Sequence, residues 1–506
     1  MSTEHITITL QPGQTVPFRN HTAYCVGTGR MGLALQQAYQ EQLRAVQALC
    51  RFRHIRGHGL FHDDMAIYQP YTDGDGTPRV RYNFTYLDQV MDSYVANGLE
   101  PFLELGFMPE QLAGSDHTLF YWKAHTVPPR DEDAWCQLVQ ATLRHLLSRY
   151  GDRVTTWPIE VWNEPNLEGF WENADKPAYL RLYEITSRAV KAVSPAFQVG
   201  GPAICGGDGS QAWVRDFLTF CEENNLPVDF VTRHAYMGQQ PSHQGNYLYH
   251  TMCPEDETIR ELQTTRDIID SFPRFRGIPL HITEFNTSYN PFCPIHDTVY
   301  NAAVMAQLLS RIGDVADSYS YWTFGDVFEE QGVPATPFHG GFGLMANGLI
   351  PKPTLWAFAW FSGLQGSCVH RDDHCLILRR EDGSYEGIAW NGNPEHPAPL
   401  TLSLSLPGAA GEWACVRERV ATGVGDPLQV WHDLGEPDTL TGEQLRLLRQ
   451  AAHPAVTTAR LTPVSGALSL TLPLSPCEVT HFTLAPAPLT PDYGYDYAWY
   501  DRFPRA

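Results

Sequence analysis

Short runs of apolar and β-branched residues alternate with longer segments of helical periodicity over the first two-thirds of the chain. Between Trp135 and Tyr150, for example, apolar residues recur at i, i+3, i+4 and i+7, the spacing of an amphipathic helix. A second helical pattern ends before Ser194 and Pro195, and a last one covers 354–364. The apolar runs predict eight strands, over 23–29, 53–60, 101–107, 156–162, 198–204, 229–236, 280–285 and 318–324.

Eight strands that alternate with helices predict an α/β fold, a (β/α)8 TIM barrel, over residues 16–365. An open, doubly wound sheet would show the same alternation. The closed barrel is favoured because residues able to do chemistry end at least four of the predicted strands, and only closure brings all those ends together.

The hydrophobic pattern changes after residue 365. Short alternating runs between Gly, Pro and Asn turns predict an accessory C-terminal antiparallel β-sandwich over 366–485, with one helix near 442–451. Residues 6–10 also alternate, and we expect this strand, within the segment 1–15, to join the sandwich. The tail over 486–506 is rich in Pro, Tyr and Asp, and we predict an extended segment, either disordered or laid along a neighbouring surface.

Composition narrows the class of partner. The 506 residues, 43% of them hydrophobic, suffice for a large barrel and a smaller domain. A net charge of −22 disfavours nucleic acid and anionic membranes, so we expect a neutral or cationic small ligand. No stretch reaches the length of a membrane span, and the first ten residues alternate like a strand, unlike a signal peptide. The 11 cysteines include no C-x-x-C pair, which predicts reduced thiols and a cytoplasmic protein; a homo-oligomer stays open.

Two glutamates at strand ends are the first candidates for chemistry. The stretch 157–171, W-P-I-E-V-W-N-E-P-N-L-E-G-F-W, predicts a strand that ends at about Asn163 and leaves Glu164 on its carboxyl-terminal rim. Tryptophans provide low-dielectric surroundings, which raise the pKa of a carboxyl group and let it hold a proton near neutral pH. A second short strand, 279–286, likewise ends around Glu284. Glycoside hydrolysis needs such a pair: one carboxyl protonates the leaving oxygen, and the other attacks the anomeric carbon or activates a water.

Four motifs carry a resemblance to a known family: E-V-W-N-E-P-N-L (160–167), R-H-A-Y (233–236), H-I-T-E-F-N-T-S-Y (281–289) and Y-W-T-F-G-D-V-F-E-E (321–330). The sequence resembles glycoside hydrolase family 39, most closely its bacterial β-xylosidases, from about residue 23 to the C-terminal region. The resemblance implies release of terminal β-D-xylose from xylo-oligosaccharides and aryl xylosides with retention of configuration. Glu164 would be the general acid and then the general base, and Glu284 the nucleophile.

The resemblance also implies binding roles near these two glutamates. Asn163 would bind the sugar 2-hydroxyl, and Trp322 would form the platform under the ring. Tyr236 would donate a hydrogen bond to the Glu284 carboxylate, and His234 would support the nucleophile side. The remaining candidates are His58 for a sugar hydroxyl, Glu329 or Glu330 for the outer hydroxyls, and Tyr289 for the pocket wall.

Two other patterns suggest different chemistry. Residues 27–32, G-T-G-R-M-G, match the dinucleotide fingerprint G-x-G-x-x-G, but the next strand lacks the acidic residue that binds a ribose. The segment H-G-L-F-H-D-D over 58–64 offers histidines and carboxylates without the spacing of a recognised metal site. We therefore predict no cofactor and no metal. The rejected metal candidates are His58, His62, Asp63 and Asp64.

Three other functions stay open: a dehydrogenase, a non-catalytic sugar-binding protein on an inactive barrel, and another specificity of the family, such as α-L-iduronidase or β-glucosidase. An iduronidase must hold a C5 carboxylate, which requires Lys, Arg or convergent backbone donors. The motifs contain one such cation, Arg233, and strand alternation turns it with Ala235 away from His234 and Tyr236. We therefore expect a neutral to acidic pocket that accepts xylose.

Overall fold

The computed structural model describes residues 4–11, 13–392, 398–488 and 494. The predicted tail therefore lies outside the described residues, except for 486–488 and 494. Across the part that is described, no helix combines the length and the apolar character needed to cross a membrane.

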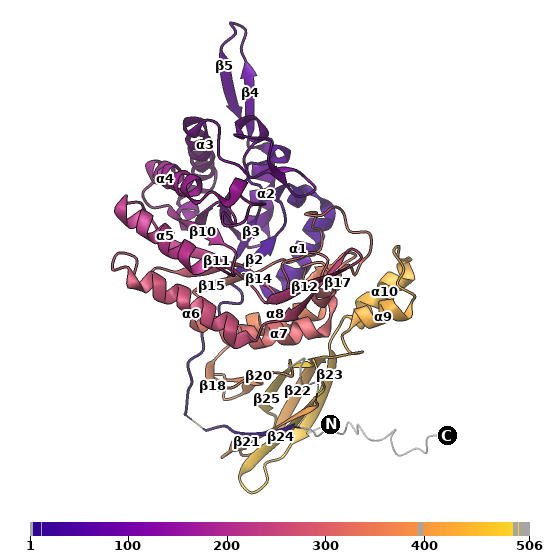
Figure 1. Ribbon diagram of the computed structural model, residues 1–506. Coiled ribbons are helices and arrows are strands. Elements are labelled where there is room, and N and C mark those ends of the chain that lie inside the picture. The colour runs from indigo at the N-terminus through magenta and orange to yellow at the C-terminus, as the bar shows by residue number, and fades with distance from the viewer. Residues whose placement is uncertain (1–3, 12, 393–397, 489–493, 495–506) are drawn as a thin grey trace.

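Eight parallel strands close into a barrel, which confirms the predicted fold (Figure 1). Each observed strand overlaps its predicted range. Neighbours in sequence are neighbours in the barrel, and the last strand pairs with the first. The strands are β2 (Cys25–Thr28), β3 (His54–Gly57), β6 (Glu100–Leu105), β9 (Pro158–Val161), β10 (Gln198–Ile204), β11 (Phe230–Tyr236), β14 (Leu280–Asn286) and β15 (Ser318–Tyr321).

Helices surround the barrel and bury one face against it. In the third of them, residues 135, 138, 139, 142, 143 and 146 are buried, the stripe that the 3.6-residue period produces. Asp131 begins this helix as its N-cap, since its carboxylate accepts a hydrogen bond from the Ala134 amide. The helices are α1 (Gln37–Cys50), α2 (Thr85–Ala96), α3 (Glu132–Tyr150), α4 (Lys176–Val193), α5 (Ser210–Glu223), α6 (Glu255–Ser271), α7 (Val299–Leu309) and α8 (Pro353–Gly363).

Two sheets below the barrel form the sandwich, whose facing apolar residues share one core (Figure 1). The larger sheet has the order β18 (Ser367–Arg371), β19 (Cys375–Arg379), β20 (Tyr385–Trp390), β25 (Val479–Pro486), β22 (Trp413–Val420) and β23 (Ala455–Leu461). The smaller contains β1 (Glu4–Thr9), β21 (Leu400–Pro407) and β24 (Ala467–Leu474). The pairs are antiparallel except that β1 runs parallel to β21, which ties the N-terminal segment to this sheet. The helix predicted near 442–451 is α10 (Gly442–Ala451), and a second helix that the pattern did not predict, α9 (Pro427–Asp433), precedes it.

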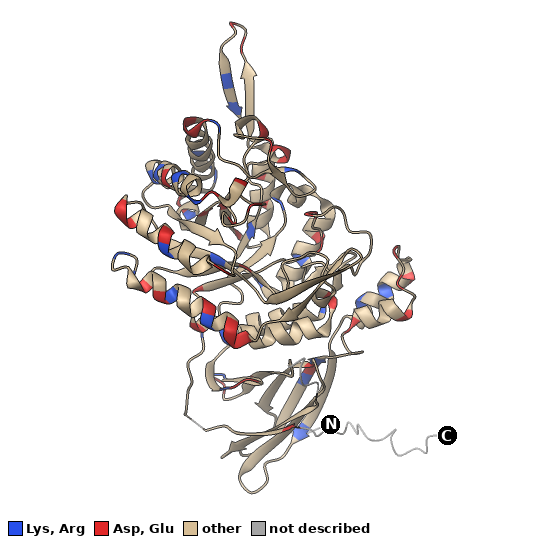
Figure 2. Cartoon of the chain, in the orientation of Figure 1, with Lys and Arg blue, Asp and Glu red and all other residues tan. Residues whose placement is uncertain are grey.

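Short hairpins are inserted in the loops between barrel strands and helices. The pair β4 and β5 extends far from the barrel at the top of Figure 1. In Figure 2 many of the charged residues lie on the outer helices, α5 and α6 among them. The hairpin strands are β4 (Tyr68–Thr72), β5 (Pro78–Tyr82), β7 (Thr118–Leu119), β8 (Ala124–His125), β12 (Gly238–Gln244), β13 (Tyr247–Met252), β16 (Met345–Ala346) and β17 (Ile350–Pro351).

Candidate active site

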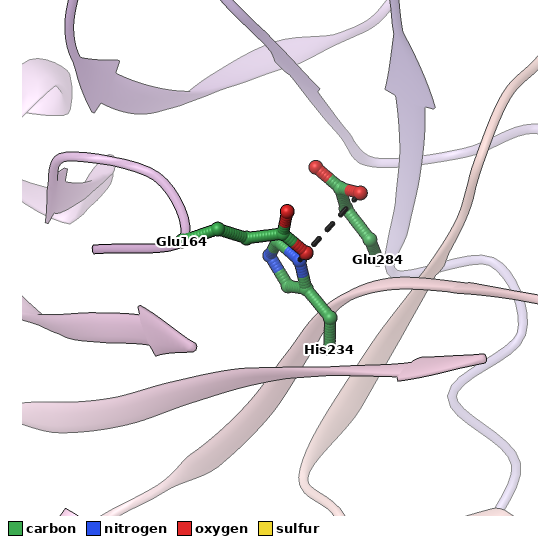
Figure 3. A group of neighbouring side chains, drawn as sticks. All are labelled: Glu164, His234 and Glu284. Carbon is green, nitrogen blue, oxygen red and sulfur yellow. Dashed lines mark hydrogen bonds and ion pairs between the residues drawn. The ribbon is translucent and has the colours of Figure 1, made fainter. Parts of the chain in front are cut away.

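Two glutamates and a histidine converge at the carboxyl-terminal ends of three barrel strands (Figure 3). Glu164 follows β9, His234 lies on β11 and Glu284 lies on β14. One carboxyl oxygen of each glutamate and one ring nitrogen of His234 all lie within 4.8 Å of one another. All three residues are buried, with exposures of 5%, 0% and 4% in that order. The barrel thus brings together carboxyl groups that are 120 positions apart in the sequence.

Glu164 is held in conditions that favour its protonated form. Burial raises the pKa of its carboxyl group well above the usual value, and the negative charge of Glu284 raises it further. His234 Nδ1 lies 2.7 Å from Glu164 Oε1 and 3.6 Å from Glu284 Oε2. The sequence interpretation placed His234 on the nucleophile side, but its hydrogen bond goes to Glu164. Burial, and then the charge of Arg56, lower the pKa of His234, so its ring is neutral at physiological pH.

Glu284 faces two hydrogen-bond donors. The Tyr236 hydroxyl donates to Glu284 Oε2 at 2.5 Å, and Arg56 Nη1 donates to Glu284 Oε1 at 2.7 Å. A positive charge and a phenol O–H are the partners that an ionised carboxylate requires when water is excluded. The environments of the two glutamates therefore differ, as acid and nucleophile roles demand.

A fully buried charge network lies under Glu284, and sequence reasoning missed it. Arg56 Nε donates to Glu160 Oε2 at 2.6 Å, and Arg56 Nη2 lies 3.0 Å from Glu104 Oε2. Glu160 Oε1 also accepts from the Thr283 hydroxyl at 2.9 Å. Strand alternation could have pointed to Arg56, because it stands two positions before His58 on the predicted strand 53–60 and so shares its face.

The Arg56 side chain also fixes the orientation of Asn163. Arg56 Nη2 donates to Asn163 Oδ1 at 2.7 Å, so the amide must present its Nδ2 atom elsewhere. That nitrogen is buried and has no hydrogen-bond partner within the described residues. Nearby, His58 Nδ1 lies 2.7 Å from Glu104 Oε2, while its Nε2 lies 3.6 Å from Glu284 Oε1. Both side chains leave polar hydrogen-bonding capacity facing the site.

Trp322 forms one wall of the site, and the glycines of the 27–32 segment make room for its ring and for nearby side chains. It follows β15, is 1% exposed, and its ring centroid lies 4.7 Å from that of His58. A Cβ atom on Gly27 would collide with the Trp322 ring, and one on Gly29 would press on Phe328. A Cβ on Gly32 would meet the Asp64 carboxylate. The G-x-G-x-x-G pattern thus has a packing explanation at this barrel end.

The two glutamates after Trp322 point in different directions. Glu330 Oε1 lies 3.8 Å from His58 Nε2, and burial, followed by the charges of Glu284 and Glu164, raises the pKa of Glu330 well above its usual value. Glu329 Oε2 instead accepts a hydrogen bond from Arg30 at 2.6 Å. Glu330 is therefore the member of the pair that faces the catalytic groups.

The other sequence candidates lie farther from Glu164 and Glu284. Tyr289 is 47% exposed, and its ring centroid lies 6.4 Å from that of Tyr236, which places it at the rim. Arg233 is fully buried on the outer side of the barrel, where it donates to Thr265 at 2.5 Å and pairs with Glu261 of α6. The alternation argument for Arg233 is thus confirmed.

The acidic segment 58–64 does not gather its side chains around one point. His62 Nδ1 lies 2.8 Å from Asp64 Oδ1, Asp64 pairs with Arg30, and Asp63 accepts from the Glu110 amide at 2.9 Å. In the part of the chain that the structure describes, Glu164, His234 and Glu284 form the one group with metal-like spacing. Burial favours the protonated form of Glu164, and Glu284 already accepts hydrogen bonds from Arg56 and Tyr236. Both features weaken these two carboxyl groups as metal ligands.

Comparisons with known proteins agree with this arrangement. The model of the glycosyl hydrolases family 39 matches residues 6–469. A β-xylosidase of Geobacillus stearothermophilus is 46% identical over 92% of each chain. A monomeric β-xylosidase of Caulobacter crescentus superposes with a TM-score of 0.85 at 33% identity, covering 95% of this chain and 99% of that one. A canine α-L-iduronidase is 29% identical over 78% of this chain and 64% of its own. The chain belongs to glycosyl hydrolase family 39 and is a glycosidase.

Proposed function

We propose that the protein hydrolyses terminal β-D-xylosides, in xylo-oligosaccharides and aryl xylosides, with retention of configuration. The observation that carries the mechanism is the approach of a Glu164 oxygen to within 4.8 Å of a Glu284 oxygen. Retaining glycosidases place their carboxyl groups about 5–5.5 Å apart, whereas inverting ones need about 6.5–9.5 Å to admit a water between them. The short separation favours direct attack by a carboxylate. The two β-xylosidases similar to this chain support the choice of sugar.

In the first half-reaction Glu284 is the nucleophile and Glu164 the general acid. Arg56 and Tyr236 orient the Glu284 carboxylate, one oxygen of which forms a bond to the anomeric carbon. The bond from that carbon to the leaving oxygen breaks, and the proton on Glu164 passes to the departing alcohol. The product is a glycosyl ester on Glu284.

In the second half-reaction Glu164 acts as the general base. Esterification removes the negative charge of Glu284, one of the causes that raise the pKa of Glu164, so the carboxylate that remains after the first step is relieved of repulsion. It takes a proton from water, whose oxygen attacks the anomeric carbon and displaces Glu284. β-Xylose leaves, and both carboxyl groups return to their starting states.

Four side chains would bind the xylose ring. The free Nδ2 of Asn163 would donate to the 2-hydroxyl, a contact that strengthens as the transition state forms. Trp322 would lie under the ring, and His58 and Glu330 would bind the outer hydroxyls. Tyr289, at the rim, would contact the leaving group.

The charges around the site favour a neutral sugar over a uronate. Each arginine nearby is already neutralised: Arg56 by three buried carboxylates, Arg30 by Asp64 and Glu329, and Arg233 by Glu261. Within the described residues, a uronate carboxylate would therefore enter an acidic pocket whose nearby arginines are already paired. We expect kcat/KM on a β-xyloside to be well above that on a β-glucoside, with no measurable α-L-iduronide hydrolysis.

A panel of nitrophenyl glycosides, read by released nitrophenol, tests this specificity. Proton NMR during hydrolysis of the preferred substrate tests the stereochemistry, because a retaining enzyme releases β-xylose first. Comparable kcat/KM on the xyloside and the iduronide would overturn the electrostatic argument. Release of α-xylose first would mean inversion and would overturn the two-step mechanism.

The proposed compartment is the cytoplasm. All 11 cysteines are free thiols, and most of them are buried. Reducing compartments keep cysteines in this form, whereas secreted proteins use them as disulfides.

A further inference from the structure

The loop that carries Glu164 adopts a backbone conformation that non-glycine residues rarely take. Trp162 has φ 73° and Glu164 has φ 44°, and on the neighbouring strand end Ala203 has φ 52°. Such left-handed residues persist only where surrounding contacts hold them. The Glu164 amide donates to the Ala203 carbonyl at 2.9 Å, so the two strained segments are joined at this point.

A second connection between the same two segments comes from Asn166. Its Nδ2 donates to the Cys205 carbonyl at 3.1 Å, and its Oδ1 accepts from the Cys205 amide at 3.0 Å. One amide side chain therefore satisfies both backbone groups of Cys205, much as a neighbouring strand would. Neither residue was among the sequence candidates.

The Cys205 thiol in turn lies close enough to the Glu164 carboxyl group for each to affect the pKa of the other. Burial, and then the charges of Glu164 and Glu284, raise the pKa of this thiol, so it stays protonated and can donate toward that carboxyl group. Glu164 is thereby held from two sides, by the thiol and by His234 Nδ1 at 2.7 Å.

We propose that Asn166 and Cys205 are positioning residues for the catalytic acid: Asn166 fixes the Cys205 backbone, and the Cys205 thiol aims the Glu164 carboxyl group at the leaving oxygen. The inference rests on the proposed function, since it assigns the two residues to the proton-transfer step. A residue that acts only through Glu164 matters when the leaving group needs a proton. It matters little when the leaving group departs as a stable anion.

The test compares xylobiose, whose leaving alcohol needs protonation, with 2,4-dinitrophenyl β-xyloside, whose leaving group does not. Asn166→Ala and Cys205→Ala should lower kcat/KM on xylobiose by about 10- to 100-fold, within the range that general acid catalysis supplies, and lower it far less on the dinitrophenyl xyloside. Cys205→Ser keeps a donor at the same position and should restore most of the xylobiose activity.

Matched controls are available elsewhere in the chain. Asn83 accepts a hydrogen bond from the Thr85 amide on an exposed loop, and the half-buried Cys136 contacts the Ile185 carbonyl of α4. Asn83→Ala and Cys136→Ala should leave both activities unchanged. Glu164→Ala provides the reference profile for complete loss of the acid.

Equal losses on the two substrates in Asn166→Ala and Cys205→Ala would mean a purely structural role and would overturn the proposal. So would a Cys205→Ser enzyme as impaired on xylobiose as Cys205→Ala. If Asn166→Ala does not fold, the two Cys205 variants decide alone. If Glu164→Ala itself loses both substrates equally, the assignment of the acid fails, and the positioning role fails with it.

Discussion

Replacing Arg56 with methionine tests the buried charge network under Glu284, the proposed nucleophile. The guanidinium is fully buried and lies 3.0 Å from Glu104, 2.6 Å from Glu160 and 2.7 Å from Glu284. Methionine keeps an unbranched side chain but removes the charge, which leaves these carboxylates without their shared cation. Removing one partner of a buried ion pair costs about 3–5 kcal/mol, so we expect Arg56→Met to lose at least that much free energy of unfolding.

The assay is urea unfolding followed by circular dichroism, with a second substitution that tests the cause. Glu160→Gln removes one unpaired charge, so Arg56→Met with Glu160→Gln should regain part of the lost stability. Arg149→Met is the matched control, because Arg149 is 40% exposed and pairs with Asp92 at the surface, where solvent screens the pair and it contributes little to stability. The reasoning is refuted if Arg56→Met is as stable as Arg149→Met, or if Glu160→Gln adds its own loss to that of Arg56→Met.

Three further changes test other parts of the account. Glu164→Ala should slow hydrolysis of xylo-oligosaccharides by about 10²–10⁴-fold but affect aryl xylosides with acidic phenols much less, and added azide should yield β-xylosyl azide; no azide product would count against the assignment. Burial lowers the pKa of His481, but hydrogen bonds to two glutamates raise it more, so that the pKa lies above 6.5 overall. The contribution of His481 to the stability of the folded protein is therefore fully present below pH 6.5 and is lost as the pH rises through the raised pKa. The stability that His481→Gln loses in urea should be larger at about pH 6 than at about pH 8.5, and an equal loss would refute the ion-pair role. Gly27→Ala should displace Trp322, raise KM for xylosides and cost about 1–3 kcal/mol, whereas Gly363→Ala, which meets open space, should change neither.

The barrel could be predicted from the sequence because its strands are buried on both faces and read as short apolar runs. The strand limits were less accurate where the backbone departs from regular geometry. β9 ends at Val161, one residue before the end of the predicted range 156–162, because Trp162 takes φ 73° and leaves the ladder. The pattern also could not fix the parallel pairing of β1 with β21, which depends on contacts between segments almost 400 residues apart.

The site was only partly predictable from the sequence. Glu164 could be proposed because a glutamate at a strand end between tryptophans is chemically distinctive, and Glu284 because a second short apolar strand also ends around a glutamate. Alternation could place Arg56 on the same face as His58, but it could not show the three carboxylate partners, which come from three other strands. The partner of His234 likewise could not be predicted, because Glu164 follows β9, a strand that is not adjacent to β11 in the barrel.

The most direct test of the two-carboxylate mechanism is to trap the covalent intermediate. A 2-fluoro-xylosyl fluoride should inactivate the enzyme. The fluorine at C2 slows both half-reactions, but the reactive fluoride leaving group keeps the first one fast enough for the glycosyl-enzyme ester to accumulate. Mass spectrometry of the digested protein should then find the fluoroxylosyl label on Glu284, and Glu284→Gln should take up none. A label on Glu164 or another residue, or continued turnover without any label, would contradict the assignment of Glu284 as the nucleophile.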